Sequence, residues 1–128
     1  CIIDVDLFKP VNDRYGHISG DEVLRRIGAL VHAHARGEDV AARIGGEEFA
    51  LLLPECDLAD AGALAERLRA AVAAEVFAPG GEPQRITISI GIAGLAAGRE
   101  SRSTLMGAAD VALYRAKSEG RNCVRIEA

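Results

Sequence analysis

Apolar positions along the chain follow two different periods, and the changes of period divide it into eight elements. Short apolar runs predict strands at Cys1–Asp6, Val40–Ile44 and Phe49–Leu53. Isoleucines alternate with smaller residues over Ile86–Ile92, which is the clearest strand pattern of the chain. Val124–Ile126 predicts a short final strand.

Three further segments repeat their apolar residues at the helical period. The first runs from about Ser19 to Gly37 and opens with a capping-box pattern, because Glu22 follows Ser19 by three residues. The second spans about Leu58–Val76, and the third spans about Thr104–Glu119 and ends at Gly120. The positions expected to face inward are Val23, Leu24, Ile27, Leu30 and Val31, then Leu58, Ala61, Leu64, Ala65, Leu68 and Val72, and last Leu105, Ala109, Ala112, Leu113 and Ala116.

The segments between these elements are expected to be loops. Leu7–His17 is mostly polar, and Pro10 favours an extended Lys9. Pro79–Gly81 and Gly94–Ser103 also predict loops. The order β-α-β-β-α-β-α-β predicts an α+β sandwich with a mainly antiparallel central sheet and packed helices, which is similar to the ferredoxin-like plan.

Composition limits the class of protein. With 128 residues, 49% apolar and 27% charged, the chain predicts one soluble globular domain, and no apolar run reaches membrane-spanning length. A net charge of −4 argues against a general nucleic-acid partner. Cys1, Cys56 and Cys123 lack metal-ligand spacing and indicate reduced thiols in a cytoplasmic setting. Because the chain opens in mid-strand without a methionine, we expect a fragment whose natural neighbours are missing.

The centre of the pattern is Arg43–Phe49, where two glycines and two glutamates separate two apolar runs. Gly45-Gly46 in that position predicts a hairpin, because glycine reaches positive φ without a steric penalty. The tip would display Glu47 and Glu48. Taken alone, this pattern fits a solvated turn as well as a functional tip.

Asp4 and Asp6 lie two residues apart on a strand, so their side chains point to the same side of the sheet. A buried strand ending in carboxylates suggests a site for a hard cation, or simply a capped turn. The pair also suggests a phosphatase that forms an aspartyl-phosphate, or a sugar-nucleotide transferase. The phosphatase is disfavoured, because Leu7-Phe8 stands where a small residue is normally needed.

Other polar pairs are ambiguous when they are considered separately. Asn12 and Asp21 are typical of turns and first helical turns, yet an acid and an amide also match a guanine edge. Lys117 and Arg121, four residues apart at a helix end, complement the helix dipole or hold a triphosphate.

Together these pieces form a specific ordered set. The set comprises Asp4-Val5-Asp6-Leu7-Phe8-Lys9, Asn12-Asp13, Gly16-His17, Gly20-Asp21, Gly45–Phe49, Ile88-Ser89-Ile90-Gly91 and Tyr114–Asn122. In order and spacing it closely resembles the GGDEF-domain family, the bacterial diguanylate cyclases, over essentially the whole chain. The resemblance implies a nucleotidyl-cyclase-like fold and condensation of two GTP molecules into cyclic di-GMP, with release of two pyrophosphates.

The resemblance implies a catalytic centre built on two Mg²⁺ (or Mn²⁺) ions. Asp4, the backbone carbonyl of Val5 and Glu47 would be their ligands, and Glu47 would also accept the proton of the attacking hydroxyl. Asp6 and Glu48 stay undecided between support of the site and a purely structural role.

The resemblance also implies how GTP is held at its phosphates. Lys9, with the backbone amides of Leu7 and Phe8, would bind the β- and γ-phosphates and stabilise transition-state charge. Lys117 and Arg121 would hold the γ-phosphate.

Guanine recognition is implied at a second group of residues. Asn12 and Asp21 would read the base, with His17 nearby and Leu24 as an apolar wall. A carboxylate accepts hydrogen bonds from the guanine ring N–H and its exocyclic amine, which adenine does not offer at those positions.

Arg36 and Asp39 match the family's product-inhibition motif, and Arg67 is the expected third member of that site. An arginine fork suits the phosphates of cyclic di-GMP. One nucleotide site per domain further implies a two-fold homodimer as the active species.

One family feature is missing from the sequence. Members usually carry an N-terminal helical segment with an Asp-x-Leu-Thr-Gly-Leu-x-Asn-Arg-like motif, which links the domain to an upstream sensory or receiver domain. The alternative to an enzyme is a non-catalytic module that binds GTP or cyclic di-GMP. Such relatives lose signature residues, whereas Gly45–Phe49 retains them all.

Overall fold

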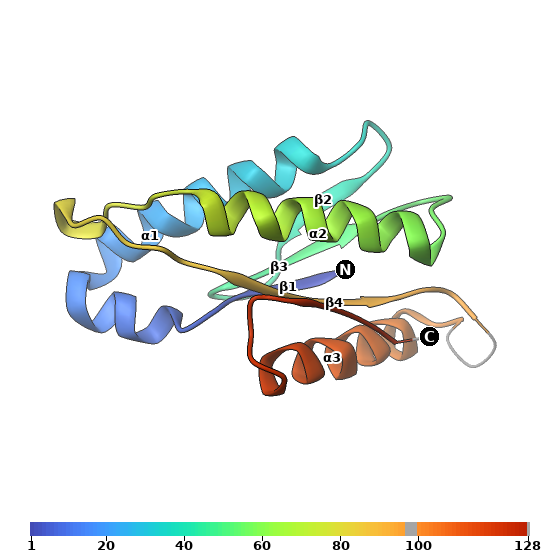
Figure 1. The fold of residues 1–128 in the computed structure, drawn as a ribbon. Coiled ribbons are helices and arrows are strands. Elements are labelled where there is room, and N and C mark those ends of the chain that lie inside the picture. The colour runs from blue at the N-terminus through green and yellow to red at the C-terminus, as the bar shows by residue number, and fades with distance from the viewer. Residues whose placement is uncertain (97–99, 128) are drawn as a thin grey trace.

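The structure of the protein is a computed structural model that describes residues 1–96 and 100–127 (Figure 1). Within that range the chain forms five strands, three α-helices and one short 3₁₀ turn. They are β1 Ile2–Val5, α1 Phe8–His34, β2 Val40–Arg43, β3 Glu48–Leu52, α2 Leu58–Ala74, η1 Pro79–Gly81, β4 Ile88–Ala93, α3 Arg102–Ser118 and β5 Val124–Glu127. The predicted order of elements is confirmed.

The described strands make one sheet in the order β2-β3-β1-β4-β5, with β1 at its centre. Neighbouring strands are antiparallel except β4 and β5, which are parallel. The expected mainly antiparallel α+β sandwich is therefore confirmed.

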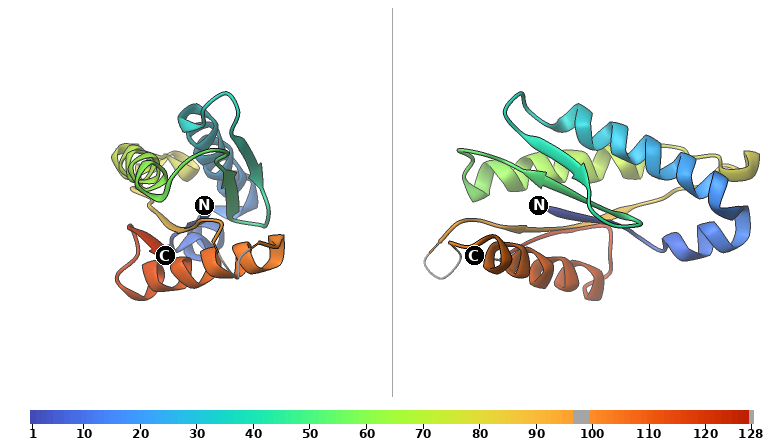
Figure 2. Two further views of the ribbon diagram at one scale, coloured as in Figure 1. Left: turned by 90° about the vertical axis from the view of Figure 1, so that its right-hand side faces the viewer. Right: turned by 180° about the vertical axis from the view of Figure 1, so that it is seen from behind.

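Helices cover both faces of the sheet. Helices α1 and α2 lie on one face and α3 lies on the other, as the end-on view in Figure 2 shows. On β1, Ile3 and Val5 belong to the large core beneath α1 and α2, while Ile2 packs with Ala109 and Leu113 of α3. This alternation places Asp4 and Asp6 on the α3 side, so the prediction that they share a face is confirmed.

Strand β4 is buried on both faces over Ile88–Ile92. Its isoleucines enter the large core. Gly91 faces α3 closely, because a Cβ there would lie 2.2 Å from the Ala109 carbonyl oxygen and 2.3 Å from the Leu113 nitrogen. Glycine is therefore required at this position by a helix packed against the strand backbone.

The expectation for Leu7–His17 is wrong. Helix α1 begins at Phe8, and Lys9 is helical rather than extended. Pro10 is tolerated because first-turn amides have no partner within the helix, so its missing N–H removes no helical hydrogen bond. Ser19 lies inside the helix and does not cap it; the break is instead at Gly16, with φ 84° and ψ 166°.

The other boundaries shift by a few residues. Asp57 caps α2 by accepting a hydrogen bond from the Asp60 amide, and Ser101 caps α3 in the same way through the Thr104 amide. The Ser101 cap moves the start of α3 two residues upstream of the prediction, whereas residues 97–99 of the predicted 94–103 loop lie outside the described residues. No helix within residues 1–96 and 100–127 combines the length and apolarity needed to cross a bilayer.

Candidate active site

Three carboxylates converge around one lysine on the α3 side of the sheet. Asp4 is 5% exposed, and its Oδ2 lies 3.0 Å from the Lys117 Nζ. Glu48 stands opposite Asp4 in the β1–β3 register. The Glu47 carbonyl oxygen accepts a hydrogen bond of 3.1 Å from the Val5 amide, which ties the hairpin tip to the end of β1.

The carboxylates in this cluster repel one another, and one lysine offsets only part of their charge. Burial raises the pKa of Glu47, the charge of Asp4 raises it further, and Lys117 opposes both. Burial and the nearby charge of Asp4 likewise raise the pKa of Glu48, and the charge of Asp110 raises it further. A cluster of like charges that lacks enough cations favours an additional positive ion.

The donor set fits a magnesium ion bound together with phosphate. Asp4 and Glu47 supply carboxylate oxygens, and Mg²⁺ commonly uses one or two carboxylates plus phosphate oxygens. Among the described residues, no group of three or more His, Cys, Asp or Glu side chains is arranged to hold a metal by itself. A cation beside Asp4 and Glu47 would therefore need further ligands, such as phosphate oxygens or water.

Asp6 is engaged by protein donors. Its carboxylate accepts hydrogen bonds from Thr87 Oγ1 at 2.7 Å, Ser89 Oγ at 2.6 Å and the Asn122 amide at 3.0 Å. Both carboxylate oxygens are used, so its geometry favours the structural alternative. Sequence reasoning missed these three partners, although the hydroxyl groups of Thr87 and Ser89 within an isoleucine strand are a signal that could have revealed two of them.

Asp6 holds a strained turn in place. Arg121 and Asn122 have φ of 61° and 47°, a region that side chains seldom adopt, directly after Gly120 at 115°. The Asn122 side chain also accepts a 2.8 Å hydrogen bond from Arg69 of α2. These contacts fix the position from which the exposed Arg121 leaves the turn.

The start of α1 presents backbone amides. Leu7 has φ 52° and makes no side-chain cap to the helix, and Phe8 is buried beneath it. Lys9 is exposed in the first turn. Uncapped first-turn amides and the positive end of the helix dipole suit a phosphate.

The buried oxygen of Asn12 lies directly against Gly20, across the break at Gly16. Asn12 Oδ1 is buried with no protein partner, and a Cβ on Gly20 would lie 1.8 Å from it. An orphaned buried acceptor of this kind awaits a donor.

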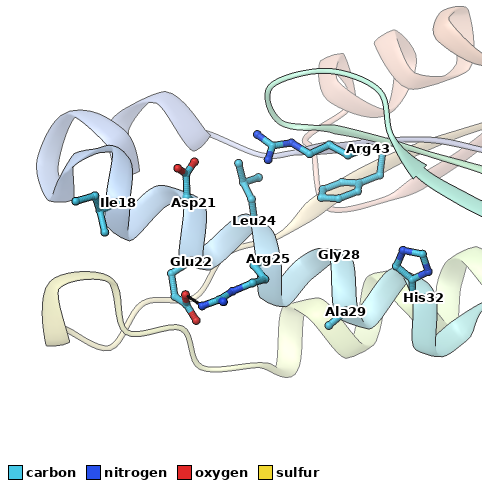
Figure 3. Close-up of a pocket in the computed structure, with 10 residues that line it drawn as sticks. Ile18, Asp21, Glu22, Leu24, Arg25, Gly28, Ala29, His32 and Arg43 are labelled. Atoms are coloured by element: carbon cyan, nitrogen blue, oxygen red, sulfur yellow. Dashed lines mark hydrogen bonds and ion pairs between the residues drawn. The ribbon is translucent and has the colours of Figure 1, made fainter.

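A hollow of roughly 800 Å³ lies between the second half of α1 and strands β2 and β3 (Figure 3). Asp21 and Leu24 point into it toward Arg43, while Glu22 and Arg25 form an ion pair on its other rim. Asp21 and Leu24 are thus brought together, whereas Asn12 and His17 do not line it.

Arg43 holds the hairpin tip and was not predicted from the sequence. Its Nε lies 3.1 Å from the carbonyl oxygens of both Gly45 and Gly46. The hairpin is confirmed, but the reason offered for its glycines is wrong, because neither has a positive φ. Nothing lies within 4 Å of a Cβ on Gly46, so this glycine leaves open space beside Glu47.

Arg36 and Asp39 form a separate polar site at the end of α1. The Arg36 Nη2 lies 3.0 Å from Asp39 Oδ1, and this arginine holds the pKa of the aspartate below its usual value. Arg67 is exposed on α2, and no hydrogen bond or ion pair within the described ranges joins it to either residue. The structure brings together two of the three expected members.

Comparison with models of protein families shows which family this chain belongs to. The family model for "Diguanylate cyclase, GGDEF domain" matches residues 1–123. The chain belongs to the GGDEF family. The expected family and fold are therefore confirmed, and Gly45–Phe49 is its signature segment.

Relatives of this GGDEF domain carry it within longer proteins. It is 45% identical to diguanylate cyclase DgcP of Pseudomonas aeruginosa over 98% of this chain and 19% of that protein. It is 42% identical to the response regulator PleD of Caulobacter vibrioides, over 96% and 28% respectively. The chain spans less than a third of either relative.

A solved structure is also very similar. The GGDEF domain of DgcB from Caulobacter crescentus, determined in complex with cyclic di-GMP, superposes with a TM-score of 0.93 at 36% identity. The match covers 98% of this chain and 75% of that one.

Proposed function

We propose that this GGDEF domain is a diguanylate cyclase, which joins two GTP molecules into cyclic di-GMP and releases two pyrophosphates. The observation that carries the proposal is the convergence of Asp4, Glu47 and Lys117 at the signature hairpin. This arrangement supplies carboxylates for a cation and a lysine for phosphate. Family membership and the named cyclase relatives add support.

The catalytic chemistry divides among few groups. Asp4, the Val5 carbonyl and Glu47 would hold two Mg²⁺ (or Mn²⁺) ions, which would neutralise triphosphate charge. Glu47 accepts the proton as the ribose 3′-oxygen of one GTP bonds to the α-phosphorus of the other and pyrophosphate departs. The raised pKa of Glu47 suits a proton acceptor. Glu48 supports Asp4 across the strand pair.

The phosphates occupy the cationic region between α1 and α3. Lys9 and the amides of Leu7 and Phe8 hold the β- and γ-phosphates, and Lys117 and Arg121 hold the γ-phosphate. Lys117 then exchanges its contact with Asp4 for phosphate oxygens. This exchange frees the Asp4 carboxylate for the cation.

Guanine lies over Asp21 and Leu24, with Asn12 and His17 at the neighbouring turn. The orphaned Asn12 oxygen supports this assignment, because guanine offers donors to it. Each domain holds one GTP, so the active species is a homodimer of this cytoplasmic domain, joined to an upstream sensory or receiver domain.

The proposal is tested on the full-length protein, or on an artificially dimerised version of it. We expect cyclic di-GMP and pyrophosphate to form from GTP with Mg²⁺, and chelation of the metal to stop the reaction. Chromatography of the nucleotides gives the result. Binding of GTP or cyclic di-GMP without turnover would instead support the non-catalytic module.

Gly20→Ala should weaken GTP binding. The new Cβ must displace the Asn12 side chain, which can swing away, and it would also lie 3.1 Å from Cζ of the buried Phe8, whose ring must shift slightly. Both shifts are small, so the fold should survive. We expect KM for GTP to rise about tenfold with little change in kcat, as for the loss of one ground-state contact. Gly107→Ala, whose Cβ meets nothing within 4 Å, is the control. An unchanged KM would refute the role of Asn12.

Arg36→Ala should abolish product inhibition. Arg36, Asp39 and Arg67 form the proposed inhibitory site, which is separate from the catalytic cluster, so binding there is allosteric. We expect turnover to be unchanged and the half-inhibitory concentration of cyclic di-GMP to rise about tenfold or more. Substitution of the exposed Arg102 by alanine should leave inhibition intact. Inhibition of the Arg36 variant at wild-type potency would show that the inhibitory site is misassigned.

A further inference from the structure

Helix α1 consists of two pieces joined at Gly16. The backbone there leaves the helical region, with φ 84° and ψ 166°, and nothing lies within 4 Å of a Cβ built on this glycine. The first piece, residues 8–15, folds back from the rest of the helix (Figure 2, right). No side chain at Gly16 restricts the angle between the two pieces, and the contacts of Phe8 and Asn12 with Gly20 join the pieces near the break.

The first piece carries much of the proposed substrate site. Its start supplies the backbone amide of Phe8 beside that of Leu7, and its side chains include the exposed Lys9 and the half-buried Asn12. Its own anchors in the core are the buried Phe8 and the partly buried Val11. A change of angle at Gly16 would move these groups together relative to Asp4 and Asp21.

A clamp at the far end of this piece restrains that angle. Glu82 Oε2 accepts hydrogen bonds from Tyr15 Oη at 2.8 Å and from Arg14 Nη2 at 3.1 Å. The Tyr15 ring also packs on Gly80, where a Cβ would lie 3.0 Å from its Cδ1. The clamp grips the two residues that directly precede the break.

The base of the clamp is anchored in the core. Phe77 and Pro79, at the start of the segment that carries Glu82, are buried. Phe77 and Gln84 exchange two backbone hydrogen bonds, of 3.0 and 2.6 Å, which close the loop that carries Glu82. Gly80 and Gly81 adopt positive φ of 61° and 83° within it. Glu82 is thus presented from a closed turn fixed to the core.

We propose that Glu82 is a positioning residue, which sets the angle of residues 8–15 at Gly16 and so places the phosphate- and base-binding groups. The functional part of this inference rests on the proposed cyclase activity. Because Arg14 and Glu82 are 67% and 54% exposed in their side chains, their ion pair contributes little to global stability. Loss of the clamp should therefore change local geometry rather than folding.

The test compares Glu82→Ala with Glu75→Ala in the full-length protein. Glu75 is the matched control, because it forms an ion pair with Arg26 of α1. Like Glu82, it joins α1 to the segment that follows α2, but Arg26 lies after the break at Gly16. Without ligand, we expect Glu82→Ala to speed hydrogen exchange of residues 8–15 about tenfold, while Glu75→Ala leaves it unchanged. Glu82→Gln should fall between, since its amide oxygen still accepts from Tyr15.

Nucleotide binding gives the second measurement. We expect Glu82→Ala to raise Kd and KM for Mg²⁺–GTP about three- to tenfold, with an unchanged unfolding midpoint. The inference would be overturned if residues 8–15 of Glu82→Ala exchanged hydrogen at the wild-type rate, or if the exchange rate rose equally throughout the domain. Failure of wild-type protein to bind or convert GTP would refute the proposed function instead, and the exchange experiment would still decide whether Glu82 sets the angle.

Discussion

Glu47→Gln should reduce cyclic di-GMP formation by about 10²- to 10⁴-fold, the range for losing a positioned proton acceptor or charge-stabilising group. The amide keeps the size of the side chain but neither accepts a proton effectively nor carries the negative charge that a divalent cation needs. Initial rates at saturating GTP and Mg²⁺ measure the loss. If the variant retained more than a tenth of the wild-type rate, the assignment of Glu47 to the catalytic centre would be wrong.

This substitution separates chemistry from folding unusually well. Burial and the charge of Asp4 both raise the pKa of Glu47, so its ionised form is disfavoured in the folded state. A neutral side chain relieves that repulsion, and we expect the variant to unfold no earlier than wild type. Glu55→Gln makes the same chemical change at an exposed turn beyond the other end of β3 and should leave the rate unchanged.

Gly91→Ala should destabilise the domain by about 3 kcal/mol, at the upper end for overpacking a tightly packed core. Its Cβ would collide with the Ala109 carbonyl oxygen and the Leu113 nitrogen, which are backbone atoms that cannot swing aside. Helix α3 would have to move off β4. Urea unfolding followed by circular dichroism gives the free energy of unfolding. In thermal unfolding we expect the melting temperature to fall by about 10 °C.

Gly107→Ala is the matched control on α3. A Cβ there meets nothing within 4 Å, so the variant should be neutral or more stable by up to about 1 kcal/mol, because alanine favours the helix. Because α3 also carries Lys117, partly folded Gly91→Ala protein should lose activity as well. A Gly91→Ala midpoint equal to wild type would contradict this close packing.

Most of the fold was predictable, because the spacing of apolar residues along the chain indicates which side chains are buried. The alternating isoleucines of β4 and the short apolar run at Cys1–Asp6 identified strands, and both strands are buried in the sheet. The first piece of α1 was not predictable in this way. Its polar surface and Pro10 argued for a loop, whereas tertiary contacts of Phe8 and the clamp on Tyr15 favour a helix.

The candidate site was predictable in its charged members and less so in its supports. Asp4, Glu47 and Lys117 were identified through the motifs that resemble the family, and the fold brings them together. Arg43, Thr87 and Ser89 were missed as site residues, because each acts through contacts with partners that the sequence pattern does not reveal.

The sequence by itself determined the family, the order of elements and the fact that Asp4 and Asp6 share one face of β1. These follow from local periods and from the ordered spacing of motifs. Only the tertiary structure decided that the oxygens of Asp6 are engaged by protein donors, that Asn12 retains an orphaned oxygen and that Glu82 accepts hydrogen bonds from Arg14 and Tyr15. The physical reason is that a hydrogen bond depends on the separation of two groups in space. Asp6 and Asn122 are 116 residues apart in the chain, and folding sets their distance at 3.0 Å.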